Sequence, residues 1–218
     1  MSPSTVHAVD DESLSLAANH LAAGRLIIVP TDTVYGIAAD ARRDRAVARI
    51  SAAKGRSARI PLQLLFANSI DLVGRYAQLS RPAIRLISAL GPGAWTIVSR
   101  AAPGWSSPAL AGGTTIGFRM PAAPAVQRLV ERLGGPLAAS SANKHGAPSP
   151  ITCQEAVDQV GEHCAIALDG GPAPIGVDST VIDCSGGEVG IIREGAIDRH
   201  QVARILGLAD IPVLRSVR

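Results

Sequence analysis

The chain has 218 residues, of which 47% are hydrophobic and 18% are charged, and its formal net charge is +3. A chain of this size can bury a core of its own, and no apolar run approaches the roughly 18 residues that would cross a membrane. Three cysteines without metal-ligand spacing and a polar N-terminus argue against a disulfide framework, structural zinc and a signal peptide, and they predict a cytoplasmic protein.

Segments with helical and with strand patterns are interleaved along the chain. The expected helices are 11–23, 44–53, 82–90, 124–133, 152–160 and 198–206. The expected strands are 26–29, 61–66, 95–98, 114–118, 137–139, 165–168, 179–182 and 189–192. This order predicts an α/β protein, and the late strands that no helix separates indicate a mixed sheet. Without a repeat or a linker, we expect one domain over 1–218 with a core at about 10–200.

Capping residues mark several of the expected helix ends. Thr152 with Glu155 three residues later is typical of a capping box, and Asp198 is a candidate N-cap of the last helix. Gly24 is a candidate stop for the first helix.

Two polar segments directly follow predicted elements. Residues 30–36, Pro-Thr-Asp-Thr-Val-Tyr-Gly, follow a buried strand, where α/β sheets bind ligands, although a turn that bonds its own backbone uses the same residue types. Lys54 and Arg56 follow a helix, whose dipole they would also complement. Lys54 is one of two lysines against nineteen arginines. The pair has the chemistry to hold phosphates, but its spacing excludes a P-loop.

Further polar residues stand at the ends of other strands. Arg119 ends an apolar strand, so it requires either an internal carboxylate or a bound anion, and Arg193 ends a later strand in the same way. Residues 138–150 bring Ser140, Ser141 and Asn143 directly after a strand, which favours a ligand site over a plain polar loop.

The sequence contains no serine-hydrolase elbow, no zinc-protease motif and no dinucleotide fingerprint. The candidate site therefore consists of cations and hydroxyls. Such groups hold and orient anions, which suits phosphorus chemistry because positioning and charge stabilisation supply most of its catalysis.

Taken together, these segments resemble the YrdC-like family of threonylcarbamoyl-AMP synthases over roughly 14–197. Each motif is weak alone, but their order and spacing are jointly specific. The motifs are PTDTVYG at 30–36, KGR at 54–56, PL at 61–62, GPGAWT at 91–96, GFRMP at 117–121, SAN at 141–143, PSP at 148–150, GVDSTV at 176–181 and IIREGAI at 191–197.

The resemblance implies an open, twisted mixed sheet flanked by helices, with a basic concave face. It implies that L-threonine, bicarbonate and ATP combine into threonylcarbamoyl-AMP and pyrophosphate. A transferase partner would then pass the threonylcarbamoyl group to tRNA, and the basic face would be available for contact with tRNA or double-stranded RNA. Mg²⁺ would enter with ATP, held mainly by the phosphates.

The resemblance also implies roles for matched residues. Lys54 and Arg56 are the expected catalytic residues, because they would hold the ATP phosphates. Arg119 would pair with the threonine carboxylate, which a guanidinium binds bidentately. The other residues expected at threonine are Thr33, Ala139 and Ser179. Those expected at the nucleotide are Thr115, Ser141, Asn143, Ser149 and Arg193, with Ser141 and Asn143 also near the magnesium.

One departure from the family pattern leaves the amino-acid selectivity open. Some relatives have a histidine in the threonine pocket where this chain has Leu65, with Gln63 nearby. Two alternatives to the synthase remain. The first is a sibling activity that adenylates a carbamoyl group derived from carbamoyl phosphate. The second is a non-enzymatic module that binds double-stranded RNA. The arginines within 42–49 would add phosphate contacts to it, although their spacing favours a solvated helix face.

Overall fold

A computed structural model describes residues 5–214. The helices are α1 (Asp11–Ala22), α2 (Asp44–Ala53), α3 (Ile70–Gly74), α4 (Arg81–Leu90), α5 (Pro124–Leu133), α6 (Cys153–Val160) and α7 (Arg199–Leu206), with short 3₁₀ turns at Pro108–Leu110 and Gly161–His163. The strands are β1 (Thr5–Ala8), β2 (Leu26–Val29), β3 (Gly36–Asp40), β4 (Gln63–Leu65), β5 (Ala77–Gln78), β6 (Trp95–Ala101), β7 (Thr115–Arg119), β8 (Leu137–Ser141), β9 (Cys164–Asp169), β10 (Thr180–Asp183) and β11 (Gly190–Arg193).

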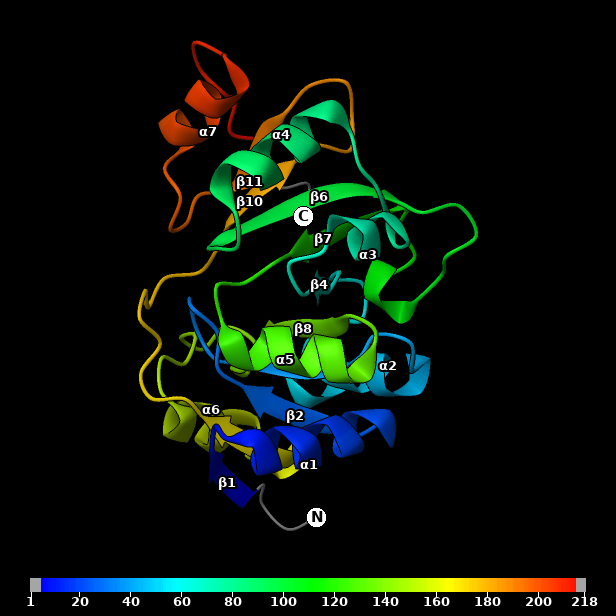
Figure 1. Ribbon diagram of the computed structural model, residues 1–218, viewed down its shortest axis with the longest axis vertical. Coiled ribbons are helices and arrows are strands. Elements are labelled where there is room, and N and C mark those ends of the chain that lie inside the picture. Colours follow the sequence, from blue (N-terminus) through cyan, green and yellow to red (C-terminus); the bar gives the residue numbers. More distant parts are fainter. Residues whose placement is uncertain (1–4, 215–218) are drawn as a thin grey trace.

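The strands form one sheet in the order β1-β9-β2-β3-β8-β4-β7-β6-β10-β11, and β5 pairs with β6 (Figure 1). Parallel and antiparallel pairs alternate irregularly along this order. For example, β4 is parallel to β7 but antiparallel to β8. The predicted open mixed sheet flanked by helices is therefore confirmed.

The sheet separates two hydrophobic cores, because successive side chains of a strand point to opposite faces. On one face, α2, α4, α6 and α7 pack against residues such as Leu64, Ile97 and Phe118. On the other face, α1 and α5 pack together over β9, β2 and β8, where Ile27 and Leu168 are fully buried (Figure 1). The candidate site lies on the continuation of this second face, over β4, β7 and β6.

The predicted helix ends are confirmed where capping residues marked them. The Thr152 hydroxyl accepts from the Glu155 backbone N–H at 3.3 Å, and the Glu155 carboxylate accepts from the Thr152 N–H at 3.2 Å. The Asp198 carboxylate caps α7 through the His200 N–H at 2.6 Å. Gly24 follows α1 with φ of +73°, a conformation that glycine adopts without steric cost.

The three cysteines are all free and buried, and burial raises their thiol pKa values to about 11 for Cys153 and about 12 for Cys164 and Cys184. None of the helices within residues 5–214 is long and apolar enough to cross a membrane.

Candidate active site

A cavity of about 670 Å³ opens on the sheet face beyond α1 and α5. Its floor consists of alternate residues of neighbouring strands. Gln63 on β4 pairs with Ala139 of β8 on one side and with Gly117 of β7 on the other. Along β7, Arg119 and Thr115 lie two residues to either side of Gly117 and line the same cavity. The period of two in a strand thus gathers these side chains on one surface.

Arg119 is the most deeply buried cation of the cavity wall, with 2% of its surface exposed. Its Nη2 donates to Asp32 Oδ1 at 2.5 Å, its Nη1 to Thr33 Oγ1 at 2.7 Å and its Nε to the Gly93 carbonyl at 2.8 Å. Burial lowers its pKa, and the Asp32 carboxylate opposes that shift. From its place in the sequence, Arg119 required either an internal carboxylate or a bound anion. The structure supplies the carboxylate and still places Arg119 at the cavity.

Arg56 lines the cavity with few firm contacts of its own. Its Nη1 lies 3.4 Å from Ser140 Oγ, and its Nη2 lies 3.3 Å from the carbonyls of both Ile60 and Pro61. Its Nε is buried without a hydrogen-bond partner in residues 5–214. Burial lowers the pKa of this guanidinium. A half-buried cation with unused donors is suited to bind an anionic ligand.

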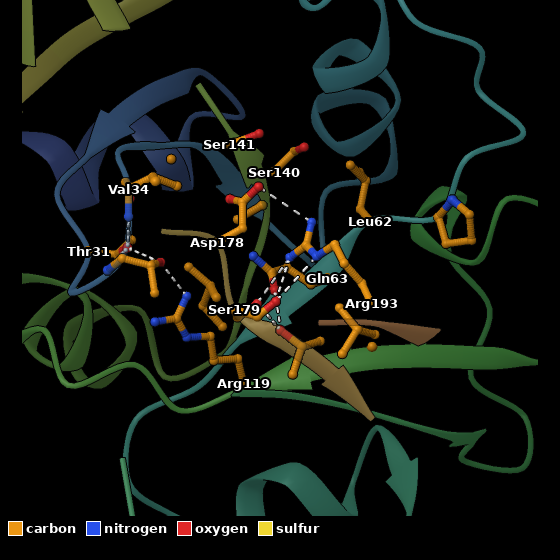
Figure 2. A pocket seen from close by; sticks show the side chains of 18 of the residues that line it. Thr31, Val34, Leu62, Gln63, Arg119, Ser140, Ser141, Asp178, Ser179 and Arg193 are labelled. Carbon is orange, nitrogen blue, oxygen red and sulfur yellow. Dashed lines mark hydrogen bonds and ion pairs between the residues drawn. The ribbon is translucent and has the colours of Figure 1, made fainter. Parts of the chain in front are cut away.

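Arg193 reaches the cavity from β11. Its Nη2 donates to the Ser179 carbonyl at 2.8 Å, and its Nη1 lies 3.6 Å from Asp178 Oδ2 (Figure 2). Asp178 also lines the cavity and accepts from Ser149 Oγ at 3.4 Å. The lining thus holds three arginines and one carboxylate, and Asp32 pairs with Arg119 from outside the lining, which leaves a net positive charge.

Lys54 is buried behind the cavity wall and does not line it. Its Nζ donates to the Ser141 carbonyl, to the Asn143 carbonyl at 2.6 Å and to Asn143 Oδ1 at 3.0 Å. These acceptors use all three ammonium donors. Burial and the nearby Arg56 lower the Lys54 pKa to about 8. Lys54 thus holds the turn that follows β8, next to Ser141, which ends β8 and lines the cavity.

A hydroxyl and amide network connects three further residues of the lining. Thr96 Oγ1 donates to Gln63 Oε1 at 3.0 Å and lies 2.8 Å from Ser179 Oγ. Neither Gln63 nor Thr96 has a role predicted from the sequence. The alternation of residues along 95–98 carried the signal for Thr96, because Trp95 and Ile97 belong to the core on the opposite face.

The structure brings most of the residues expected from the sequence to this one cavity. Those that line it are Thr33, Arg56, Thr115, Arg119, Ala139, Ser141, Ser179 and Arg193. Lys54, Asn143 and Ser149 lie behind this lining, each in contact with a residue that belongs to it. Leu65, where relatives have a histidine, also lines the cavity and pairs with Arg119 across β4 and β7.

The donor set is compatible with magnesium that arrives on a substrate. Within residues 5–214, no group of three histidine, cysteine or carboxylate side chains gathers where it could hold a metal ion. Magnesium commonly keeps several waters and binds phosphate oxygens with only one or two protein ligands. The Ser141 hydroxyl donates to Asn143 Oδ1 at 2.5 Å, so these two oxygens lie together at the nucleotide side expected from the sequence.

Comparison with known proteins identifies relatives along nearly the whole chain. The Sua5/YciO/YrdC family model, described as telomere recombination, matches residues 19–195. A Mycobacterium tuberculosis relative is 37% identical over 194 residues, which cover 88% of both chains. A Bacillus subtilis threonylcarbamoyl-AMP synthase is 34% identical over 199 residues, which cover 91% of this chain and 58% of that protein.

Solved structures share the fold. The structure of Pyrococcus abyssi Sua5 complexed with L-threonine matches with a TM-score of 0.90 and 30% identity, and the match covers 97% of this chain and 62% of that one. Escherichia coli YciO matches with a TM-score of 0.80 and 24% identity, over 91% of this chain and 98% of that one. The chain thus spans about three fifths of the longer relatives.

Proposed function

The chain belongs to the Sua5/YciO/YrdC family, and we propose that it is a threonylcarbamoyl-AMP synthase that uses L-threonine, bicarbonate and ATP. The observation that carries this proposal is the convergence of Arg56, Arg119 and Arg193, which are distant in sequence, on one cavity lined with hydroxyls. A cavity of about 670 Å³ is within the range of sites for small-molecule ligands.

The reaction needs positioning and positive charge more than a nucleophile on the protein. The threonine amine attacks the carbon of bicarbonate, a C–N bond forms, and one oxygen leaves as water to give a carbamate. A carbamate oxygen then attacks the α-phosphorus of ATP, and the bond to the bridging oxygen breaks to release pyrophosphate. Both steps join anions, so fixed cations that replace their water shells lower the barrier.

The amino acid occupies the Arg119 end of the cavity in this proposal. Arg119 binds its carboxylate with the two N–H groups that remain, because Asp32, Thr33 and Gly93 accept from three of the five guanidinium donors. Thr33, Ala139 and Ser179 surround the rest of the amino acid. Leu65 makes this end more apolar than a histidine would.

The nucleotide occupies the opposite end. Arg56 and Arg193 bind its phosphates, and Thr115 and Ser141 line its side of the cavity. Magnesium enters with ATP and neutralises phosphate charge when it is bound, with Ser141 and Asn143 nearby. Lys54 adds its charge from behind the wall and keeps the 141–143 turn in place, and Ser149 fixes Asp178.

We further propose that the product serves the N6-threonylcarbamoyladenosine modification of tRNA through a transferase partner, and that a basic face contacts RNA. A cytoplasmic location fits the three free cysteines, because thiols stay reduced there.

Pyrophosphate release by the purified protein tests the proposal. We expect release only when ATP, threonine and bicarbonate are all present, together with threonylcarbamoyl-AMP detected by mass spectrometry. Release that ignores threonine would refute the assignment. Turnover of carbamoyl phosphate in place of threonine and bicarbonate would identify the carbamoyl-adenylating sibling instead, and salt-dependent RNA binding without turnover would identify an RNA-binding module.

A further inference from the structure

Gln63 provides the amide at the middle of the cavity floor. It lies on β4 beside Gly117 of β7, and Thr96 of β6 reaches across Gly117 to donate to Gln63 Oε1 at 3.0 Å. The missing side chain of Gly117 makes this contact possible. A Cβ at that position would lie 3.2 Å from Thr96 Cγ2 and 3.9 Å from Gln63 Cβ.

Gln63 accepts the last of a series of hydrogen bonds in which each residue donates to the next. Because the Thr96 hydroxyl has a single proton and donates it to Gln63, the Ser179 hydroxyl 2.8 Å away must be the donor to Thr96. Ser179 Oγ in turn lies 3.4 Å from Arg193 Nη2, which donates to it. The chain of donors therefore starts at a cation, and each bond polarises the next.

This series of hydrogen bonds fixes the orientation of the Gln63 amide. Its Oε1 is occupied by Thr96, while its Nε2 has no hydrogen-bond partner in the part of the chain that the structure describes. The side chain is half-buried and lines the cavity. Two N–H groups thus remain at the cavity floor for an oxygen of a ligand.

The position of Gln63 identifies which oxygen this is. Two residues of a strand span about 6.6 Å, so Gly117 and Gln63 form the row midway between Arg119 and Thr115. Figure 2 shows Gln63, Ser179 and Arg193 between Arg119 on one side and Ser140 and Ser141 on the other. The carboxyl group that links the amino acid to the nucleotide must lie in this middle row if the two substrates occupy the two ends.

We propose that Gln63 binds the carboxyl group that comes from bicarbonate. Its Nε2 donates to a bicarbonate oxygen and, after the C–N bond forms, to the carbamate oxygen that does not attack phosphorus. No proton moves to or from Gln63 in either step. This assignment rests on the proposed function and names a subsite within it. A donor held by fixed neighbours stabilises the anion without reorganising during the reaction.

The variant Gln63→Met tests this subsite, because it keeps the length of the side chain and removes the donor. We expect the KM for bicarbonate to rise, or kcat to fall at saturating threonine and ATP, by about 10- to 100-fold. The KM values for threonine and ATP should stay within about twofold, as should threonine affinity measured by calorimetry without bicarbonate. Gln154→Met, at an exposed position of α6 away from the cavity, should change none of these values.

Two further variants separate this role from a structural one. Gln63→Glu places a negative charge in the same volume, so its loss should exceed that of Gln63→Met. Thr96→Val removes the hydroxyl that orients the amide, and it should raise the KM for bicarbonate in the same direction but less. Melting temperatures report whether each variant is folded.

The outcomes distinguish the subsite from the proposed function. An active wild-type protein whose Gln63→Met variant has unchanged bicarbonate kinetics would overturn the subsite alone. An equal rise in the KM for threonine would instead assign Gln63 to the amino acid. A wild-type protein without threonine- and bicarbonate-dependent pyrophosphate release would overturn the proposed function, and the subsite with it.

Discussion

Arg56 lines the cavity, and its hydrogen bonds to the rest of the protein are long, at 3.3 to 3.4 Å. We therefore expect Arg56→Ala to lower the rate of pyrophosphate release by about 100- to 1,000-fold, as the loss of a preorganised charged donor does. The free energy of unfolding should change by less than about 1 kcal/mol, because weak contacts are lost. Arg59→Ala, three residues along the chain and exposed, is the matched control and should keep full activity.

Lys54 gives the site a dependence on pH. Burial lowers its pKa to about 8 from an ordinary value of 10.5, so its charge is lost as the pH rises through about 8. ATP affinity should therefore weaken between pH 7.5 and 9.5 by about tenfold or less. Calorimetric titration of ATP across this range checks the prediction. The variant Lys54→Met should bind ATP more weakly at pH 7.5 and show a flatter profile, and an equally steep profile would contradict the role.

The same titration affects stability in the opposite direction. A lysine whose pKa is lower in the folded state than in the unfolded state binds fewer protons when folded. The free-energy cost of burying the charged ammonium lowers stability fully below about pH 8. This cost disappears as the pH rises toward 10.5. In the proposed function, Lys54 thus favours ATP binding at neutral pH, whereas its titration favours stability at high pH.

At the scale of single elements, α6 offers a test of local stability. The Thr152 hydroxyl caps its first turn through the Glu155 N–H at 3.3 Å, and Thr152 does not line the cavity. Thr152→Ala should lower the free energy of unfolding by about 1 kcal/mol and leave kcat unchanged. Denaturant unfolding measures this loss. Thr152→Ser keeps the capping oxygen and should remain close to the wild type.

Two of the strands that the sequence did not predict, β3 and β1, were missed for different physical reasons. β3 follows the 30–36 motif without a break, and its alanines, Ala38 and Ala39, have little intrinsic preference for strands. β1 lies at the edge of the sheet, where Val6 is 48% exposed, so its pattern lacks a buried face. Segments with strong apolar periodicity and capping residues were predicted to within a few residues.

The candidate site was predictable only in part. Alternation along 115–119 shows which residues share a face, but no spacing shows that residues 56, 119 and 193 meet. The family resemblance supplied that expectation. The inward direction of the Lys54 ammonium had no sequence signal, because its acceptors lie 87 to 89 residues away. The contact between Gln63 and Thr96 is visible only in the folded sheet, where Gly117 of β7 lies between them.

Across the whole molecule, the Arg119–Asp32 ion pair joins two distant parts of the sheet. Asp32 follows β2 and Arg119 ends β7, with β3, β8 and β4 between these strands in the sheet order. Both side chains are at least 95% buried. Removal of one partner from such a pair leaves an uncompensated buried charge, which is far more costly than replacing both.

Arg119→Met should therefore lower the free energy of unfolding by about 3 to 5 kcal/mol. The double variant with Asp32→Asn should recover much of this loss, because no unpaired charge remains buried. Threonine affinity should stay strongly reduced in both variants, since the carboxylate has lost its partner. Denaturant unfolding and threonine calorimetry measure the two effects. A double variant as unstable as the single one would show that packing, not charge, governs this contact.

Trp95 gives the molecule an internal optical probe. Its indole lies fully buried beneath the cavity floor, donates to the Gly91 carbonyl at 2.7 Å and packs edge-on against Phe118 at a centroid distance of 6.3 Å. Trp105, the other of the two tryptophans, packs against Tyr76 instead. With Trp105→Phe, the fluorescence of a single indole next to Thr96 would follow each substrate as it enters, without any attached dye.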